Sequence, residues 1–284
     1  MGVAHIGVLR ALNEIGIFPH AVAGTSMGAI AGALYALHRS TDIAEKILYT
    51  VLKSSAFKKL GFEKYNFGQG DVDKENRLKH ISDKIKKWVS YNYALQSDFL
   101  IQYNTYKEII DSIVPDIDIR ELTMPFGCVS TELTHGRPEY ITSGSLRNAL
   151  YRSSAIQGII EPFFSDGRLY ADGGPSENVP VTLLKQFGGN FAFSCFIGRM
   201  PYMHKKSFTV IDAIKRANET TMFRMGRLFS EKSDFAIEPQ FNKGNWWNFT
   251  LAPYYIKTGY QAVMQHKKEI KKKIFRKRVF FLRS

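Results

Sequence analysis

The chain has 284 residues, and its hydrophobic fraction of 44% and charged fraction of 23% are close to the averages of globular proteins. This composition excludes a disordered, collagen-like or low-complexity chain, and the length suits one α/β domain with a substantial core. The formal net charge of +13 is unevenly placed, because residues 267–284 carry nine lysines or arginines and one glutamate. We therefore expect one domain over residues 1–266 and a basic C-terminal tail over residues 267–284.

The first third of the chain has the order helix, strand, turn and helix. Apolar residues recur at helical spacing over residues 3–15, and Gly16 follows as a stop signal. Residues 20–24 predict a short buried strand, and residues 27–37 have the composition of a buried helix. Residues 41–114 are more polar and rich in lysine, so we interpret them as a helical insertion in the domain. Its helical patterns cover residues 43–52, 78–89 and 106–114.

Strands and helices alternate in the second half. Predicted strands cover residues 126–133, 138–142, 168–172, 190–198 and 234–239. Predicted helices cover residues 145–152, 181–187 and 254–266, the first of them capped by Ser145. Asp166-Gly167 has the signature of a hairpin turn. The alternation predicts a three-layer α/β/α fold with a mostly parallel central sheet.

No segment has the pattern of a secretion signal or a membrane span. Arg10 interrupts the apolar N-terminal stretch, and no small-residue cleavage site follows it. The longest uncharged stretch, residues 21–37, is at the lower limit for a span and is better explained as a strand, turn and helix. Cys128 and Cys195 lie within predicted strands, which favours buried thiols over a disulfide. We therefore expect a cytoplasmic protein.

A G-x-S-x-G motif, Gly24-Thr25-Ser26-Met27-Gly28, falls where the first predicted strand meets its helix. In such a motif the serine stands on a strained turn that exposes its hydroxyl, and the two glycines relieve contacts that a Cβ would make. The helix that starts there aims backbone amides, including that of Met27, toward the position of an oxyanion. This context favours Ser26 as a nucleophile over a merely structural turn of small residues.

A second motif, Asp172-Gly173-Gly174, ends another predicted strand. A serine hydroxyl needs a group that takes its proton, and a rigidly held, partly desolvated carboxylate can do so. The plainer reading of an Asp-Gly pair is a turn, which is our interpretation of Asp166-Gly167.

A histidine base is the alternative to Asp172. His204 or His266 could complete the order Ser, Asp, His of the α/β-hydrolases. That fold places several strands before its serine, whereas 23 residues precede Gly24 in this chain. We therefore favour a Ser26/Asp172 dyad and interpret the histidines, His5 among them, as surface residues or satisfied core residues.

Four blocks of the sequence, in chain order, resemble those of the patatin-like phospholipases. They are GVAHIGVL at 2–9, GTSMG at 24–28, SSAIQG at 153–158 and DGRLYADGGPSENVP at 166–180. The resemblance implies the patatin-like three-layer fold, lipid acyl esters as substrates, and neither metal nor cofactor. It also implies that Ser26 attacks an ester carbonyl while Asp172 accepts its proton and returns it to the leaving alcohol.

The sequence departs from the family pattern at two places. Gln157 stands where the family has proline, and we expect this change to be tolerated. The family begins with a strand and a glycine-rich loop whose amides form the oxyanion hole, and of this loop the chain retains Gly2. The expected oxyanion donors are therefore Gly2 and Met27. We expect a truncated or mis-started gene product, and the alternative is a catalytically inactive lipid-binding or regulatory protein.

The basic tail, residues 267–284, interleaves lysines and arginines with large apolar residues. This pattern fits peripheral contact with an anionic membrane about as well as it fits a solvated terminus. Nucleic acid is not an expected partner, because no recognised nucleic-acid-binding module accompanies the charge.

Overall fold

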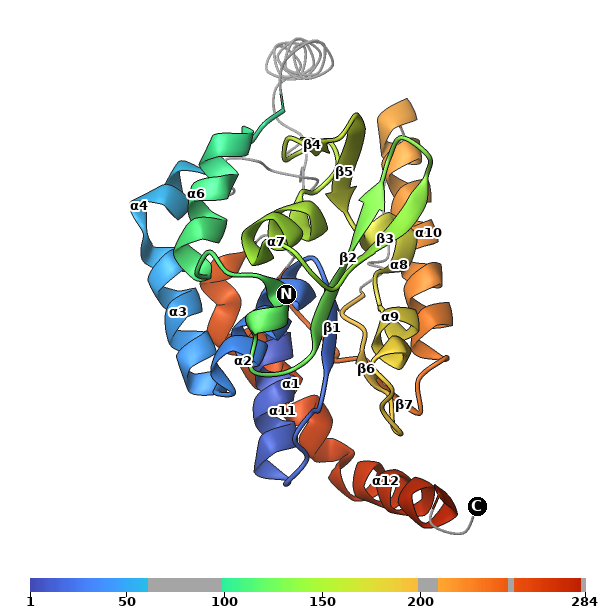
Figure 1. The fold of residues 1–284 in the computed structure, drawn as a ribbon. Coiled ribbons are helices and arrows are strands. Elements are labelled where there is room, and N and C mark those ends of the chain that lie inside the picture. Colours follow the sequence, from blue (N-terminus) through green and yellow to red (C-terminus); the bar gives the residue numbers. More distant parts are fainter. Residues whose placement is uncertain (61–98, 199–208, 245–247, 282–284) are drawn as a thin grey trace, which may run out of the picture.

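The computed structural model describes residues 1–60, 99–198, 209–244 and 248–281 (Figure 1). A five-stranded sheet lies among helices at its centre. Its strands are β1 (Val22–Thr25), β2 (Phe126–Glu132), β3 (Arg137–Ile141), β4 (Phe163–Ser165) and β5 (Arg168–Asp172). A separate two-stranded parallel sheet contains β6 (Phe193–Cys195) and β7 (Phe235–Ile237).

Strand β2 organises the larger sheet because three other strands pair with it. Strand β3 runs antiparallel along one edge, opposite residues 128–132 of β2. Strand β1 pairs with residues 126–129 of β2 and β5 pairs with residues 130–132. Because a strand has two edges and β3 occupies one, β1 and β5 share the other. Strand β1 is parallel to β2 and β5 is antiparallel, so the C-terminal ends of β1 and β5 meet.

The α/β class is confirmed, but the expectation of a mostly parallel sheet is wrong for the strands that the structure describes. In the five-stranded sheet β1–β2 is a parallel pair, whereas β2–β3, β2–β5 and β4–β5 are antiparallel. The reason is the length of the connections. Asp166-Gly167 links β4 to β5 in a tight hairpin, and residues 133–136 link β2 to β3, and such short links join antiparallel strands.

Helices cover the sheet and fill the N-terminal core. They are α1 (Ala4–Glu14), α2 (Met27–His38), α3 (Thr41–Lys53), α4 (Ser55–Lys59), α6 (Tyr103–Ile113), α7 (Leu146–Ser154), α8 (Gly174–Glu177), α9 (Val181–Gln186), α10 (Val210–Ser230), α11 (Ala252–Gln265) and α12 (Lys267–Phe281), with short 3-10 helices at Ile119–Glu121 and Phe249–Leu251. Helix α2 is almost wholly buried, as its small apolar residues predict. Helices α1 and α11 approach closely because Gly7 and Gly259 each face the other helix's backbone.

Most of the predicted elements agree with the structure to within a few residues. The predicted helix at 78–89 lies outside the described residues. Helix α10 has no counterpart in the sequence prediction, and the strand predicted at 190–198 is shorter, as β6. Cys128 and Cys195 are free thiols on β2 and β6, as expected. The segment predicted as a tail begins with helix α12, whose Ile270 is fully buried.

Candidate active site

Ser26 stands on a sharp turn between β1 and α2. Its backbone has φ 57° and ψ −129°, a left-handed conformation that is costly for a residue with a side chain. The turn folds α2 back tightly over β1, so a Cβ at Gly24 would overlap the backbone of Gly28 and Ala29. Gly24 is therefore required by the turn. At Gly28 a Cβ would meet the His5 ring at 3.5 Å, an ordinary contact.

The strained turn is held from the neighbouring helix α7. The amide of Ser26 donates to the carbonyl oxygen of Ser153 at 3.0 Å and to its hydroxyl at 3.1 Å. The Ser153 hydroxyl in turn donates to the Val129 carbonyl at 2.7 Å, which ties the turn to β2. These bonds offset part of the cost of the backbone conformation.

Asp172 is the last residue of β5 and lies opposite Ser130 of β2. Thr25, the residue before Ser26, lies opposite Val129, so the two strands deliver Ser26 and Asp172 to adjacent positions along one edge of β2. The side chain of Ser26 lies close enough to the Asp172 carboxylate to lower its pKa. The structure therefore brings together the two residues that the sequence predicts as a dyad.

The Asp172 carboxylate is 5% exposed and held in place by its own turn. Its Oδ1 accepts a hydrogen bond from the Gly174 amide at 2.7 Å. A Cβ at Gly173 would overlap the Val129 carbonyl, so this glycine lets the turn lie against β2. At the other predicted glycine, Gly174, a Cβ would lie 2.7 Å from the terminal methyl of Met222, a flexible group that can move aside, and 3.0 Å from the Asp172 Oδ1.

Burial raises the pKa of Asp172 to about 6, although hydrogen bonds from Ser26 and from the Gly174 amide act in the opposite direction. Desolvation disfavours the charged carboxylate, and here it outweighs the two donors. A carboxylate with a pKa near 6 is ionised at neutral pH, yet it is basic enough to take a proton during a reaction.

Sequence reasoning missed the residues that position Asp172 from behind. The side-chain amide of Gln157 donates to the Asp172 carbonyl at 2.7 Å, and the Thr131 hydroxyl donates to the same oxygen at 2.9 Å. Gln157 thus makes a hydrogen bond that a proline at this position could not make. The block SSAIQG at 153–158 was the available signal in the sequence, because it contains both Ser153, in the last turn of α7, and Gln157, which follows that helix.

The two expected oxyanion donors lie against each other. Gly2 packs on Met27 so closely that a Cβ at Gly2 would overlap the Met27 side chain. Met27 is the first residue of α2, where a helix leaves its amides without intrahelical acceptors. The Gly2 carbonyl faces the His5 ring, whose Nδ1 lies 2.6 Å from the oxygen.

The histidines do not take the place of Asp172 within the described residues. His5 hydrogen-bonds to the carbonyls of Gly2 and Cys195, and burial lowers its pKa. It is thus a satisfied core residue, as expected. His266 contacts Glu269 and the Phe235 ring where α11 meets α12. His204 lies outside the described residues.

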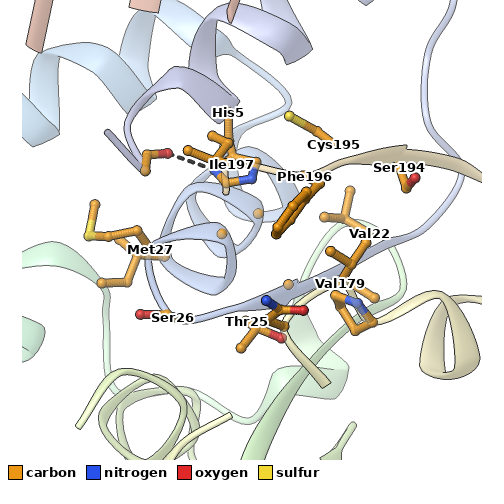
Figure 2. A pocket seen from close by; sticks show the side chains of 18 of the residues that line it. His5, Val22, Thr25, Ser26, Met27, Val179, Ser194, Cys195, Phe196 and Ile197 are labelled. Atoms are coloured by element: carbon orange, nitrogen blue, oxygen red, sulfur yellow. Dashed lines mark hydrogen bonds between the residues drawn. The ribbon is translucent and has the colours of Figure 1, made fainter. Parts of the chain in front are cut away.

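Ser26 and Asp172 both line a large, mainly apolar cavity that reaches between β1 and β6. Figure 2 shows Ser26 at the end of β1 with Met27 beside it, and His5 and Phe196 near the first turns of α2. Across the described parts of the chain, no three His, Cys, Asp or Glu side chains gather where they could share a metal ion. Nor does any helix that the structure describes have the length and apolar composition needed to cross a bilayer.

The serine stands on a strained turn between a strand and a helix, and a buried carboxylate lies beside it on a mixed α/β sheet. This arrangement defines a class of protein, which comparison with known families identifies. The family model of the patatin-like phospholipases matches residues 1–185. The chain belongs to the patatin-like phospholipase family.

Two curated relatives illustrate the similarity. Lysophospholipase nte1 of Aspergillus fumigatus is 27% identical over 201 residues, which cover 69% of this chain and 11% of that protein. Lysophospholipase NTE1 of Cryptococcus neoformans var. neoformans serotype D is 30% identical over 190 residues, which cover 66% of this chain and 10% of that protein. The chain thus matches about a tenth of the length of these relatives.

A solved structure shares the fold. The crystal structure of VipD from Legionella pneumophila superimposes with a TM-score of 0.50 and 14% sequence identity, covering 94% of this chain and 65% of that chain. At this identity the similarity concerns the fold alone.

Proposed function

We propose that the chain is a lipid acyl hydrolase that cleaves carboxylic esters of phospholipids or related lipids with a Ser26/Asp172 dyad. The observation that carries the proposal is the meeting of β1 and β5 on one edge of β2, which places a strained serine beside a buried carboxylate. Membership of the patatin-like phospholipase family and the similarity to lysophospholipases support lipid esters as the substrate class.

The reaction follows from the roles that the site offers. The Ser26 Oγ attacks the ester carbonyl carbon while its proton passes to the Asp172 carboxylate. The amides near Gly2 and Met27 are the candidate donors to the resulting oxyanion. The intermediate collapses to an acyl-serine, and Asp172 returns the proton to the leaving alcohol. Asp172 then takes a proton from water as the water oxygen attacks the acyl-serine, and it returns that proton to the Ser26 Oγ as the fatty acid leaves.

A fluorophosphonate probe tests this proposal, because it reacts with an activated serine and not with an ordinary hydroxyl. We expect labelling of the parent chain and its loss in Ser26→Ala. Ser145→Ala is the matched control, since Ser145 is a helix-capping serine at the far end of α7, and it should be labelled like the parent. Absence of labelling and of ester hydrolysis in a folded chain would instead favour a lipid-binding protein without turnover.

Contact of residues 267–284 with an anionic membrane stays a prediction. It is supported by the free face of α12, where Lys268, Lys271 and Lys272 are exposed and Phe275 is 68% exposed. Replacement of the three lysines by glutamate is a sharper test than deletion of the helix, because deletion also removes the buried Ile270. Unchanged sedimentation of the triple variant with phosphatidylserine-containing vesicles would contradict the prediction.

A further inference from the structure

Three large apolar side chains stand in a row at the end of the five-stranded sheet. Phe164 of β4 and Leu169 of β5 are cross-strand partners, 68% and 41% exposed. Leu133 follows β2, is 41% exposed, and donates its amide to the Leu169 carbonyl at 2.8 Å. Because directly paired residues point to the same face of a sheet, the three side chains are neighbours. We call Leu133, Leu169 and Phe164 the apolar row.

The row begins where the cover of the sheet ends. On the same face, two residues further into β2 and β5, Thr131 and Ala171 are buried. The Thr131 hydroxyl donates to the Ser176 hydroxyl at 2.9 Å, so helix α8 covers this part of the sheet. The apolar row lies beyond that cover. An exposed contiguous group of large apolar side chains is typical of a surface that meets a partner or a lipid.

The row lies at a defined distance along β5 from the candidate base, Asp172. Leu169 precedes Asp172 by three residues of β5, which at strand spacing is about 10 Å along the strand, and this odd separation places the two side chains on opposite faces of the sheet. Strand β1 is parallel to β2, and β2 ends at the row. The chain direction of β1, which ends just before Ser26, therefore points toward the row. Figure 1 shows the β4–β5 hairpin at the top of the molecule and α12 at the bottom. The two surfaces therefore lie at opposite ends of the molecule in this view.

Charges around the row nearly cancel. Glu132 is buried at the base of the row, and its carboxylate contacts His135 at 2.7 Å and Arg137 at 3.2 Å. Arg168 and Asp166 are exposed beside Leu169 and have opposite charges. This balance suits a surface with paired positive and negative groups, such as zwitterionic phospholipid headgroups, and differs from the mainly basic exposed face of α12.

We propose that the apolar row inserts into the surface of a zwitterionic phospholipid layer and holds this end of the sheet, which also carries Ser26 and Asp172, against the layer. The proposal rests on the proposed hydrolase function. An apolar group at an interface enters about 5–10 Å into the boundary between headgroups and acyl chains, where the ester groups lie. Leu133, Phe164 and Leu169 are not among the residues that line the apolar cavity, so the row anchors the molecule at the layer and takes no part in holding the lipid inside the cavity. The two-residue Asp166-Gly167 turn, with positive φ at both residues, fixes the register that pairs Phe164 with Leu169.

The test compares two phenylalanines of equal exposure. Phe164→Asp removes the most exposed member of the apolar row, and Phe275→Asp makes the same change on α12, where the side chain is also 68% exposed. We expect Phe164→Asp to lower sedimentation with phosphatidylcholine vesicles by at least about tenfold, and hydrolysis of vesicle lipid by a similar factor. Hydrolysis of a soluble short-chain ester should stay within about twofold of the parent.

Phe275→Asp should leave binding to phosphatidylcholine vesicles unchanged. Equal vesicle binding of Phe164→Asp and the parent, or a loss confined to Phe275→Asp, would overturn the proposal. Circular dichroism and the melting temperature establish that both variants are folded. The soluble ester separates the two proposals, because a parent that binds vesicles through the row but hydrolyses no ester refutes the enzyme and not the docking surface.

Discussion

The candidate active site and helix α12 differ in the interactions that hold their residues in place. At the site, Ser26 and Asp172 are fixed by backbone hydrogen bonds and by glycines that allow backbones to touch. Helix α12 is attached by the buried Ile270 and by long lysine side chains that reach Asp234. Short backbone bonds fix atoms far more narrowly than flexible side chains do. Changes at the site should therefore alter chemistry, and changes in α12 should alter stability in small steps.

The largest effect is expected for Asp172→Asn. Asparagine keeps the shape and can still accept from the Gly174 amide, but it cannot take the serine proton. Loss of a general base costs about 10²- to 10⁴-fold in turnover. In the parent, the rate should rise as pH increases through about 6, the raised pKa of Asp172, and then level off. Ester hydrolysis measured from pH 4.5 to 8.5 checks both points, and a flat profile in the parent would contradict the assignment.

The same substitution should increase stability above pH 6. Burial raises the folded-state pKa of Asp172 from 3.8 to about 6, so the folded chain binds a proton that the unfolded chain has already lost. The free energy of unfolding therefore falls as pH rises from about 4 to about 6, by up to about 3 kcal/mol from this group. Asp172→Asn removes this loss. Urea unfolding at pH 5 and pH 7.5 should show the largest gain at pH 7.5, and a loss there would contradict the role of burial.

The two glycines of the serine motif should respond in opposite directions. Gly24→Ala places a Cβ on the backbone of Gly28 and Ala29, and we expect a loss of at least about 3 kcal/mol in unfolding free energy. Gly28→Ala finds ordinary contact with His5 and sits within α2, so we expect a gain of up to about 1 kcal/mol. Thermal unfolding of both variants gives the comparison. Equal effects would mean that the turn is looser than the tight approach of β1 and α2 indicates.

In α12 the largest contribution should come from Ile270. It is fully buried against Val263 and Phe235, so Ile270→Ala should cost about 2–3 kcal/mol of unfolding free energy. Phe275→Ala on the exposed face of the same helix is the control and should change stability by less than about 0.5 kcal/mol. Neither variant should change hydrolysis of a soluble ester. A loss of activity in Ile270→Ala at temperatures where it is folded would contradict the separation of the two regions.

The sequence predicted the parts of the site that depend on local geometry. The glycine spacing around Ser26 and the Asp-Gly-Gly turn each specify a conformation, and both motifs lie where expected. The pairing of β1 and β5 along one edge of β2 could not be predicted in the same way, because it depends on residues far apart in the chain. The hydrogen bonds from Ser153 and Gln157 were missed for the same reason. The helix within the basic tail, α12, was not predicted, because lysines surround its two apolar positions, Ile270 and Ile274, that pack on β6 and β7.

The smallest effect is expected at the ion pair between Lys277 and Asp234, whose Nζ and Oδ2 atoms lie 2.5 Å apart. Burial would raise the pKa of Asp234, but hydrogen bonds from Lys277 and from the Ala192 amide outweigh it, and the pKa is lowered. A lowered pKa stabilises the fold above the pKa of the unfolded carboxyl, and this contribution is lost as pH falls through the folded-state value.

Both side chains of this pair are about one-third exposed, so solvent weakens the attraction. Lys277→Ala should therefore cost less than about 1 kcal/mol, and less still in high salt. Lys272→Ala, on the exposed face, is the matched control and should have no measurable effect on stability. Urea unfolding of both variants at low and high salt tests this. If Lys277→Ala lowered the free energy of unfolding by more than Ile270→Ala does, the ion pair and not the buried isoleucine would be the main attachment of α12. The contrast between α12 and the backbone-held site would then rest on electrostatics instead of packing.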